Sequence, residues 1–567
     1  MKKTKKNIQK INLQATLMSI GTLLSRILGF LRDLFIANFF SKTETDIFFV
    51  AFRFPNFFRR ILGEGTFTAS ITPALTENLN TQGWEETKKL HNALSTLLFS
   101  IVIVITVLGI FFIPYILKAF FENSAYSNVE AKLEKTILIG RLVFTYFFFV
   151  SFYSYFMSVA QVFGKFFIPA VAPAFFNLSL ILFAWTPQSW WAFPSMSLAW
   201  AVILGGFLQI LPTLYEMKKL NLLPQFSFHK KKELKQILKR FLPGMLGLSG
   251  LSCISLINVY FTGSLEEGAN SYIYYGDRLM EFPRALIALS IGSALIPEFT
   301  KQYTQKNIQS LKETLSYYLR FILFLTLPFS LLFFLQSETI IQFIFGRGQF
   351  DRDSVIITAH LLKIYALVLI FSSLSRILSS CLFALNKNWL MTLGALFFVG
   401  FHFLCAFFLT PLYGLNGLIF ATALSSLFFF LILIFCLFFL VGSLNLKSIL
   451  SLLFNIAPGL LALALSLLLI PNLFSSLHFF LTKNFFNSSL DVSYIPLTFS
   501  DFLKPLNLNY ISSYPFISFI FFSFSCLIAA FLYLRLNLFC KEPISYDVLK
   551  LLTKMKSLKI KKPVKKI

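Results

Sequence analysis

Charged residues are scarce in this sequence. Only 13% of the 567 residues are Asp, Glu, Lys or Arg, whereas about 25% is usual for a soluble domain. A chain of this length with so few charges lacks the polar surface that a water-soluble globule needs. Apolar runs of about 20 residues, long enough to cross a bilayer as a helix, recur from end to end. The sequence therefore predicts an all-α membrane protein.

Cysteine and catalytic motifs are lacking too. The six cysteines form no C-x-x-C pair, and all but the last lie inside apolar runs, so neither a disulfide framework nor a metal site is expected. No phosphate-binding loop, H-E-x-x-H or G-x-S-x-G motif occurs. His360 and His402 stand alone on apolar runs, where core packing is the favoured interpretation. We expect no enzyme activity, no metal and no cofactor.

The chain is nevertheless strongly basic, with a net charge of +25. Its lysines cluster at the two termini and around residues 230–239, and no basic domain with interleaved aromatic residues accompanies them. Nucleic acid is therefore not an expected partner. Membrane topology and the anionic headgroups of membrane lipids explain the same charge more simply.

The apolar runs predict about fourteen transmembrane helices. In chain order the expected spans are 14–39, 47–74, 90–118, 136–162, 166–186, 196–217, 241–263, 273–299, 314–335, 356–385, 389–410, 413–441, 449–471 and 513–536. If both termini are cytoplasmic, most lysines and arginines fall on inside segments, as the positive-inside rule requires. The segment around Trp190 and Trp191, which has no lysine or arginine, then falls outside.

A weak internal repeat divides these spans. A shift of 224 residues carries Phe58-Arg59-Arg60 onto Phe282-Pro283-Arg284 and Pro73 onto Pro297. The repeat predicts two six-helix lobes in parallel orientation, related by an axis along the membrane normal. The expected domains are an N-terminal lobe (1–220), a C-terminal lobe (221–441), two extra helices with a long outside loop (442–536) and a basic cytoplasmic tail (537–567).

Arginines inside the spans are the most informative residues. Each costs about 2.5–3.5 kcal/mol at a bilayer centre, so it must meet water or a counter-charge. Spacing indicates some pairing: Arg26 and Asp33 share a helix face, and Glu281 is within reach of Arg278 and Arg284. The cations still outnumber the acids. The arginines of spans 14–39, 47–74 and 273–299 are Arg26, Arg32, Arg53, Arg59, Arg60, Arg278 and Arg284, and the acids, counting Asp46, are Asp33, Asp46, Glu64, Asp277 and Glu281.

This surplus of guanidinium groups suits a phosphate or pyrophosphate ligand, because the planar group keeps its charge and matches phosphate oxygens. A purely structural interpretation stays open, in which the arginines reach the membrane interface or only form salt bridges. Pro55, Pro73, Pro283 and Pro297, together with Gly63-Glu64-Gly65, indicate helices that break or bend, as transporters use at binding sites. Simple tolerance of these residues in a membrane bundle is the alternative.

Long motifs in these spans resemble a known family, the MurJ (MviN) lipid II flippases of the multidrug/oligosaccharidyl-lipid/polysaccharide exporter superfamily. The resemblance covers the runs Leu24-Ser25-Arg26-Ile27-Leu28-Gly29-Phe30-Leu31-Arg32-Asp33, Thr45-Asp46-Ile47-Phe48-Phe49-Val50-Ala51-Phe52-Arg53-Phe54-Pro55-Asn56-Phe57-Phe58-Arg59-Arg60, Gly63-Glu64-Gly65, Tyr274-Tyr275-Gly276-Asp277-Arg278-Leu279-Met280-Glu281-Phe282-Pro283 and, more weakly, Gly346-Arg347-Gly348-Gln349-Phe350.

The resemblance implies a transporter that moves lipid II, an undecaprenyl-pyrophosphate-linked sugar-peptide, from the cytoplasmic to the periplasmic leaflet of the bacterial inner membrane. It also implies a central cavity lined by functional arginines and a groove for the lipid tail beside the last two helices. The matching substrate-binding positions are Arg26, Arg32, Asp46, Arg59 and Arg278, with Glu64 and Glu281 also on motif positions. A monomer is expected, and other cell-wall synthesis proteins are candidate partners.

Two departures from the family are visible. Some relatives carry a sodium site with acidic side chains, but span 389–410 has His402 and Cys405 and no acid, so sodium coupling is not expected. The outside segment near residues 472–512 is longer than the family pattern.

Alternating access between the two lobes is the expected mechanism. The alternatives are an exporter of another lipid-linked oligosaccharide and a drug or ion antiporter of the same superfamily. A polyprenyl-phosphate transferase would need a metal-binding acid cluster, and a scaffold for envelope assembly would tolerate loss of the arginines.

Overall fold

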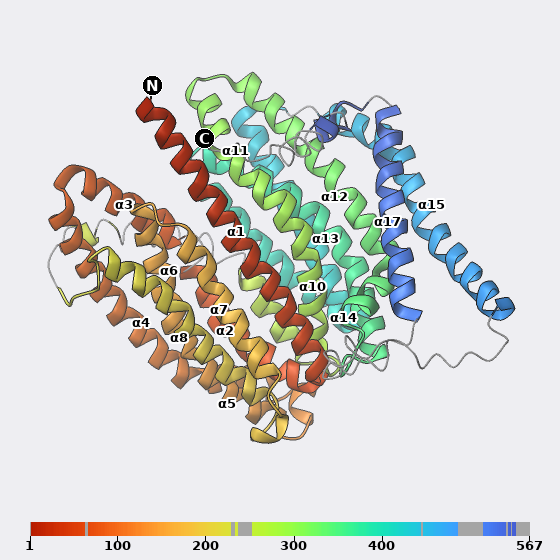
Figure 1. Cartoon of the computed structure of the whole chain (residues 1–567), viewed down its shortest axis with the longest axis horizontal. Helices are drawn as coiled ribbons and strands as arrows, with labels where there is room; N and C mark the ends of the chain where they lie inside the picture. The colour runs from red at the N-terminus through yellow and green to blue at the C-terminus, as the bar shows by residue number, and fades with distance from the viewer. Residues whose placement is uncertain are drawn as a thin grey trace, which may run out of the picture. The chain divides into compact units, whose positions relative to one another are not determined.

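The computed structural model describes residues 2–62, 66–227, 233–235, 237, 252–443, 446–485, 514–539, 542–545 and 547–550. Within these residues all regular elements are helices, and most are long (Figure 1). Nine helical runs in this part of the chain are long and apolar enough to cross a membrane. The predicted all-α membrane class is confirmed, and the total of fourteen spans stays a prediction.

The first of two compact units comprises Met1–Tyr275, Arg347–Ser354 and Ala395–Leu418. Its elements before residue 220 are α1 (Lys2–Phe39), α2 (Lys42–Leu62), α3 (Thr66–Gln82), α4 (Trp84–Phe121), η1 (Ala125–Asn128), α5 (Lys132–Phe144), α6 (Tyr146–Val162), α7 (Phe167–Ala184), η2 (Gln188–Trp190) and α8 (Ser195–Lys219). Helix Ser252–Thr262 and the start of α10 (Ala269–Arg284) follow. Helix α7 packs along both α1 and α8, and α5 packs against α2 and α4 (Figure 1).

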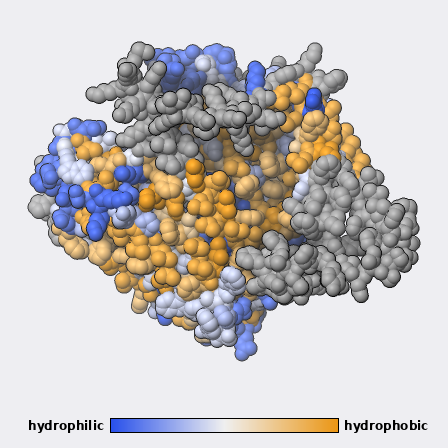
Figure 2. All heavy atoms as spheres, in the orientation of Figure 1, coloured by the Kyte–Doolittle hydropathy of each residue, from blue (hydrophilic) through white to orange (hydrophobic). Residues whose placement is uncertain are grey.

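Aromatic side chains fill the core of this unit. Phe58 meets the rings of Phe144 and Phe147 edge-on, with centroid distances of 5.7 and 5.6 Å. Edge-to-face contacts of this kind add about 0.5–1.5 kcal/mol beyond the burial of area. The outer surface is apolar as well: Phe111 is 57% exposed and Tyr115 61%. On the face drawn in Figure 2, apolar residues form a broad area and hydrophilic residues gather at its margins, as a lipid environment requires.

The second unit comprises Gly276–Gly346, Val355–Gly394 and Ile419–Ile567. It contains the end of α10, a π-helical turn η3 (Ala285–Leu289), α11 (Ser290–Thr304), α12 (Ile308–Phe345) and most of α13 (Arg352–Ala384). The end of α14 (Asn388–Val441), α15 (Leu446–Phe485) and α17 (Tyr514–Phe539) complete it, and α15 packs along α17 and α12 (Figure 1). The lobe boundaries expected from the internal repeat stay a prediction.

Several expected spans differ in detail. Span 136–162 divides into α5 and α6 at Thr145, whose hydroxyl donates to the Leu142 carbonyl at 2.7 Å and tightens the turn. Spans 389–410 and 413–441 are two helical segments of α14, which a kink at Gly414, where φ is 57°, separates. That left-handed backbone is accessible to glycine at little cost. Only residues 252–263 of span 241–263 lie among the described residues.

The segment expected to lie outside after residue 471 begins as a continuation of α15, which extends to Phe485. Pro471 removes one helical hydrogen bond without ending the helix, and apolar residues continue beyond it. Residues 486–513 lie outside the described part of the chain.

The motif Gly346-Arg347-Gly348-Gln349-Phe350 brings the chain against the end of α1. The Gln349 amide donates to the Asn38 carbonyl at 3.0 Å. Gly348 has a φ of +59°, and a Cβ added there would lie 2.2 Å from the same carbonyl oxygen. Glycine is therefore required at 348 for both its conformation and its size.

We expect Gly348→Ala to lower the thermal unfolding midpoint of the purified protein by several degrees more than Gly83→Ala does. Gly83 has a φ of +83° and a ψ of −174° but no atom within 4 Å of an added Cβ, so it tests the backbone cost alone, about 1–3 kcal/mol. Only Gly348→Ala adds a clash with backbone. Equal midpoints for the two variants, measured by intrinsic fluorescence in one detergent, would contradict this assignment.

Candidate functional site

Arg32 lies at the centre of a polar network between α1, α7 and α10. Its Nε and Nη2 donate to Oδ1 of Asp33 at 2.9 and 2.6 Å, its Nη2 to the Tyr274 hydroxyl at 2.8 Å, and its Nη1 to Asn177 Oδ1 at 3.1 Å. The Tyr274 hydroxyl in turn donates to Asp33 at 2.9 Å. Asp33 is fully buried. Arg32 therefore has its counter-charge inside the protein.

Arg26 is different. It lies on α1 among exposed apolar neighbours such as Leu23 and Ile27. Within the described part of the chain no hydrogen bond or ion pair to Arg26 is found, and the side chain is exposed. The expected match of Arg26 with Asp33 does not form, because Asp33 binds the adjacent Arg32 instead. Arg26 thus presents an unneutralised guanidinium from a long helix.

The arginines near the end of α2 are half-buried. Arg59 donates through Nε to Asn56 Oδ1 at 2.7 Å, one turn earlier on the same helix. Arg53 is half-buried as well. Glu64, with its two flanking glycines, lies outside the described residues.

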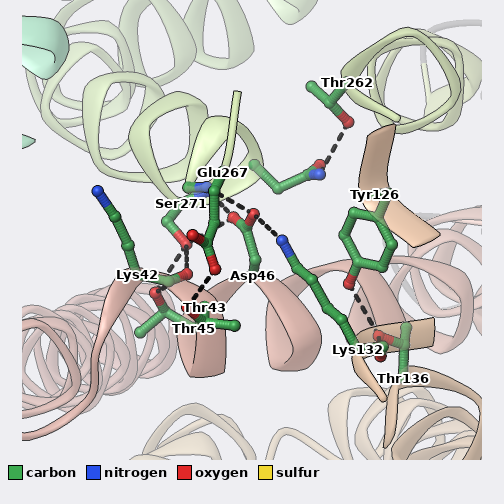
Figure 3. Close-up of polar contacts among 12 residues, drawn as sticks. Lys42, Thr43, Thr45, Asp46, Tyr126, Lys132, Thr136, Thr262, Glu267 and Ser271 are labelled. Carbon is green, nitrogen blue, oxygen red and sulfur yellow. Dashed lines mark hydrogen bonds and ion pairs between the residues drawn. The ribbon is translucent and has the colours of Figure 1, made fainter. Parts of the chain in front are cut away.

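Asp46, near the start of α2, is almost fully buried and accepts four hydrogen bonds (Figure 3). Its Oδ1 accepts from the amide and the hydroxyl of Ser271, both at 2.9 Å. Its Oδ2 accepts from the Gly268 amide at 2.8 Å and from the Lys132 ammonium at 3.1 Å. The carboxylate thus caps the N-terminus of α10, where free amides and the helix dipole favour a negative charge.

Lys132 provides the counter-charge for this group from the start of α5. Its side chain is 2% exposed, and its ammonium lies 4.2 Å from the centroid of the Tyr126 ring. Burial, together with the charge of Asp46, raises the pKa of Tyr126 well above its ordinary value. The neutral phenol shares a 2.8 Å hydrogen bond with Thr136. We call Asp46, Lys132, Gly268 and Ser271 the α2–α10 clamp.

The second unit carries the remaining expected residues, Arg278 and Glu281, both half-buried on α10. Glu281 pairs with Arg284 one turn later, as its spacing predicted. Helix α10 then continues into the π-helical turn η3. Each unit therefore holds part of the expected set, and the convergence of these side chains on one cavity stays a prediction.

Sequence reasoning missed Tyr274, Asn177, Lys132 and Ser271. Tyr274 lies inside a motif. A tyrosine among apolar residues gives no sign in the sequence that its hydroxyl forms hydrogen bonds with charged groups. Asn177 is the lone amide in the apolar stretch 166–186, and an isolated polar residue in a membrane span is a signal that could have been read. Lys132 lies just before an expected span, where a buried role has no signature in one sequence.

Known proteins resemble this chain over most of its length. The family model described as lipid II flippase MurJ matches residues 35–494. A probable lipid II flippase MurJ of Bdellovibrio bacteriovorus is 36% identical over 428 residues, which cover 75% of this chain and 81% of that protein. The lipid II flippase MurJ of Burkholderia cenocepacia is 32% identical over 66% of this chain and 74% of its own length.

Solved structures agree in fold. A lipid II flippase MurJ in an inward closed conformation has a TM-score of 0.70 and 21% identity, and the match covers 92% of this chain and 99% of that one. An inward-facing multidrug resistance transporter of the MATE family has a TM-score of 0.63 and 15% identity, with 75% of this chain and 96% of that one covered. At such identities the likeness concerns the fold alone. The family model and the Bdellovibrio relative establish more: this chain belongs to the MurJ family of lipid II flippases, multi-pass membrane transporters rather than enzymes.

Proposed function

We propose that this protein moves lipid II from the cytoplasmic to the periplasmic leaflet of the bacterial inner membrane, with both termini in the cytoplasm. Membership of the MurJ family supports the cargo, because the matching relatives carry the name lipid II flippase. The proposal extends to the chemistry of recognition: guanidinium groups bind the pyrophosphate of the cargo.

Arg26 is the observation that carries this recognition. A guanidinium held in a membrane without a counter-charge costs about 2.5–3.5 kcal/mol or more, and the described residues supply none for Arg26. A pyrophosphate would supply that charge with oxygens that match the planar donors. Arg59 and Arg278, both half-buried, add further cations from α2 and α10.

The other expected site residues have different proposed roles. Arg32, neutralised by Asp33, positions the hydroxyl of Tyr274. Asp46 holds α2 to the start of α10, because both of its oxygens are already bonded within the α2–α10 clamp. Contacts of Glu64 and Glu281 with the cargo stay predictions.

Alternating access is the proposed transport cycle. A carrier of this kind must break and remake contacts at the end through which cargo leaves. The α2–α10 clamp suits that purpose, because a cap on a helix terminus is satisfied by few atoms and can be replaced by water when it opens. The distribution of positive charge along the sequence predicts that the start of α10 faces the outside of the membrane.

A drug or ion antiporter of the same superfamily is the second candidate, since a MATE transporter shares the fold. Such a carrier needs an acidic side chain for its cationic cargo. Among the described motif acids, Asp33, Asp46 and Glu281 are each bonded to a cation. Asp277, half-buried on α10 directly before Arg278, is the exception. This arrangement favours an anionic cargo.

We expect Arg26→Ala and Arg278→Ala, made separately, to fail to support growth of a cell depleted of its own lipid II flippase. Each loses a charged donor worth about 1.5–3 kcal/mol to a bound phosphate. Arg535→Ala is the matched control, since this exposed arginine lies over the Phe531 ring of α17, 5.2 Å from its centroid. Full growth of both variants at normal protein levels would leave the recognition proposal without support.

The membrane potential should drive transport. Moving one charge through 100 mV is worth about 2.3 kcal/mol, and a pyrophosphate cargo carries roughly two negative charges at neutral pH. We therefore expect liposomes with a negative interior to export fluorescent lipid II faster than liposomes with the opposite potential. A rate that is the same for both signs would refute electrogenic transport of an anion.

Loss of the α2–α10 clamp should open the outer end of the carrier. We expect Asp46→Asn to increase, several-fold, the reaction of a cysteine placed at the buried Thr262 with a membrane-impermeant thiol reagent added outside the cell. Glu44→Gln is the control on the same helix, because Glu44 binds Ser195 and Lys135 and not α10. Labelling that rises equally in both variants would indicate general loosening rather than a clamp.

A further inference from the structure

A second group of cations lies in the second unit, outside the motifs that define the family resemblance. Arg376 on α13 reaches α11, where its Nη2 donates to the Ser293 hydroxyl at 3.3 Å. The residue at position 292 of α11 is glycine, and a Cβ there would lie 3.1 Å from Cγ and 3.4 Å from Nε of Arg376. The absence of a side chain at 292 thus lets the arginine lie flat against α11.

Within the described part of the chain Arg376 forms no ion pair, and its Nε is buried without an acceptor. A buried donor without a partner costs about 1–3 kcal/mol, more for a charged group. The outer part of the same guanidinium remains open, because its contact with Ser293 is exposed.

A second arginine adds to the positive charge near Arg376. Arg284 at the end of α10 is close enough to Arg376 for their positive charges to repel. Glu281 pairs with Arg284, so this carboxylate compensates one of the two cations. The π-helical turn Ala285–Leu289 begins directly after Arg284, and such turns occur frequently at functional sites.

We propose that Arg376 and Arg284 form a phosphate-binding subsite within the second unit. Arg376 offers the exposed part of its guanidinium, and Arg284 adds positive charge that Glu281 offsets. The Ser293 hydroxyl, which donates to the Leu289 carbonyl at 2.9 Å, accepts from Arg376 and holds the guanidinium in place. The ligand is the phosphate group of a lipid, either the pyrophosphate of the polyprenyl-linked cargo or the phosphodiester of an anionic phospholipid. The first source rests on the proposed function; the second does not.

Binding to the full-length protein in maltoside detergent, which contains no phosphate, tests the subsite. The probes are farnesyl pyrophosphate and a short-chain phosphatidylglycerol, and dissociation constants are measured for the parent, Arg376→Gln and Arg535→Gln. We expect Arg376→Gln to weaken one of the two probes about tenfold, as for the loss of one charge-assisted contact, and Arg535→Gln to weaken neither. The probe that weakens identifies the source of the phosphate.

Arg376→Lys provides a test even if Arg376→Gln fails to fold. Lysine keeps the charge but has no planar fork of donors, so we expect binding to weaken a few-fold with an unchanged thermal midpoint. If both probes bind Arg376→Lys and a folded Arg376→Gln as tightly as the parent, the subsite does not exist.

Arg26→Gln separates this inference from the proposed function. If Arg26→Gln binds farnesyl pyrophosphate normally while Arg376→Gln does not, the subsite stands and the role proposed for Arg26 fails. The reverse pattern removes the subsite and leaves the proposed function intact.

Discussion

A positive charge placed within a membrane has to meet a negative one, and this constraint organises the polar residues of the protein. Water and lipid headgroups are not available at depth, so each guanidinium or ammonium group is either neutralised by the chain or left for a ligand. Arg32, Arg284 and Lys132 meet Asp33, Glu281 and Asp46. Arg26 and Arg376 meet no carboxylate among the described residues. These five cations therefore fall into two groups, those with a carboxylate partner and those without one among the described residues.

Two of the neutralised cations, Arg32 and Lys132, stabilise helix packing. Lipid tails are as apolar as the helices, so a hydrophobic driving force between membrane helices is weak and packing with a few polar contacts takes its place. In the first unit, aromatic rings supply the packing, and polar groups join helices at a small number of points. Besides the Arg32 network and the α2–α10 clamp, His91 on α4 bonds Tyr155 of α6 at 2.9 Å and the Leu222 carbonyl at 2.9 Å. Each contact joins segments far apart in the sequence, which specifies one arrangement of an otherwise uniform apolar bundle.

Prediction from the sequence succeeded where the signal is carried by single helices. The length of the apolar runs set the helical class, and a spacing of three residues paired Glu281 with Arg284. Prediction failed where the partner of a residue depends on how distant segments pack together. The spacing of seven residues placed Asp33 on the same face as Arg26, but the long side chain of the adjacent Arg32 folds back to the carboxylate, and Tyr274 and Asn177 hold it there. Lys132 and Ser271, 86 and 225 residues away from Asp46, have no pattern that one sequence could reveal.

The sign of the cargo follows from charge and not from fold. A MATE transporter and a MurJ flippase both match this chain in architecture, so the helix arrangement does not distinguish a carrier of cations from a carrier of anions. A carrier of cations needs a carboxylate that is free to exchange its partner. In the first unit, Asp33 accepts from Arg32 and Tyr274, and Asp46 accepts from an ammonium, two amides and a hydroxyl. Releasing either for a cargo would leave a buried cation or a helix terminus unsatisfied, which costs several kcal/mol. Arg26 has no partner among the described residues that a ligand would have to displace. The group most available to a ligand in the first unit is therefore positively charged.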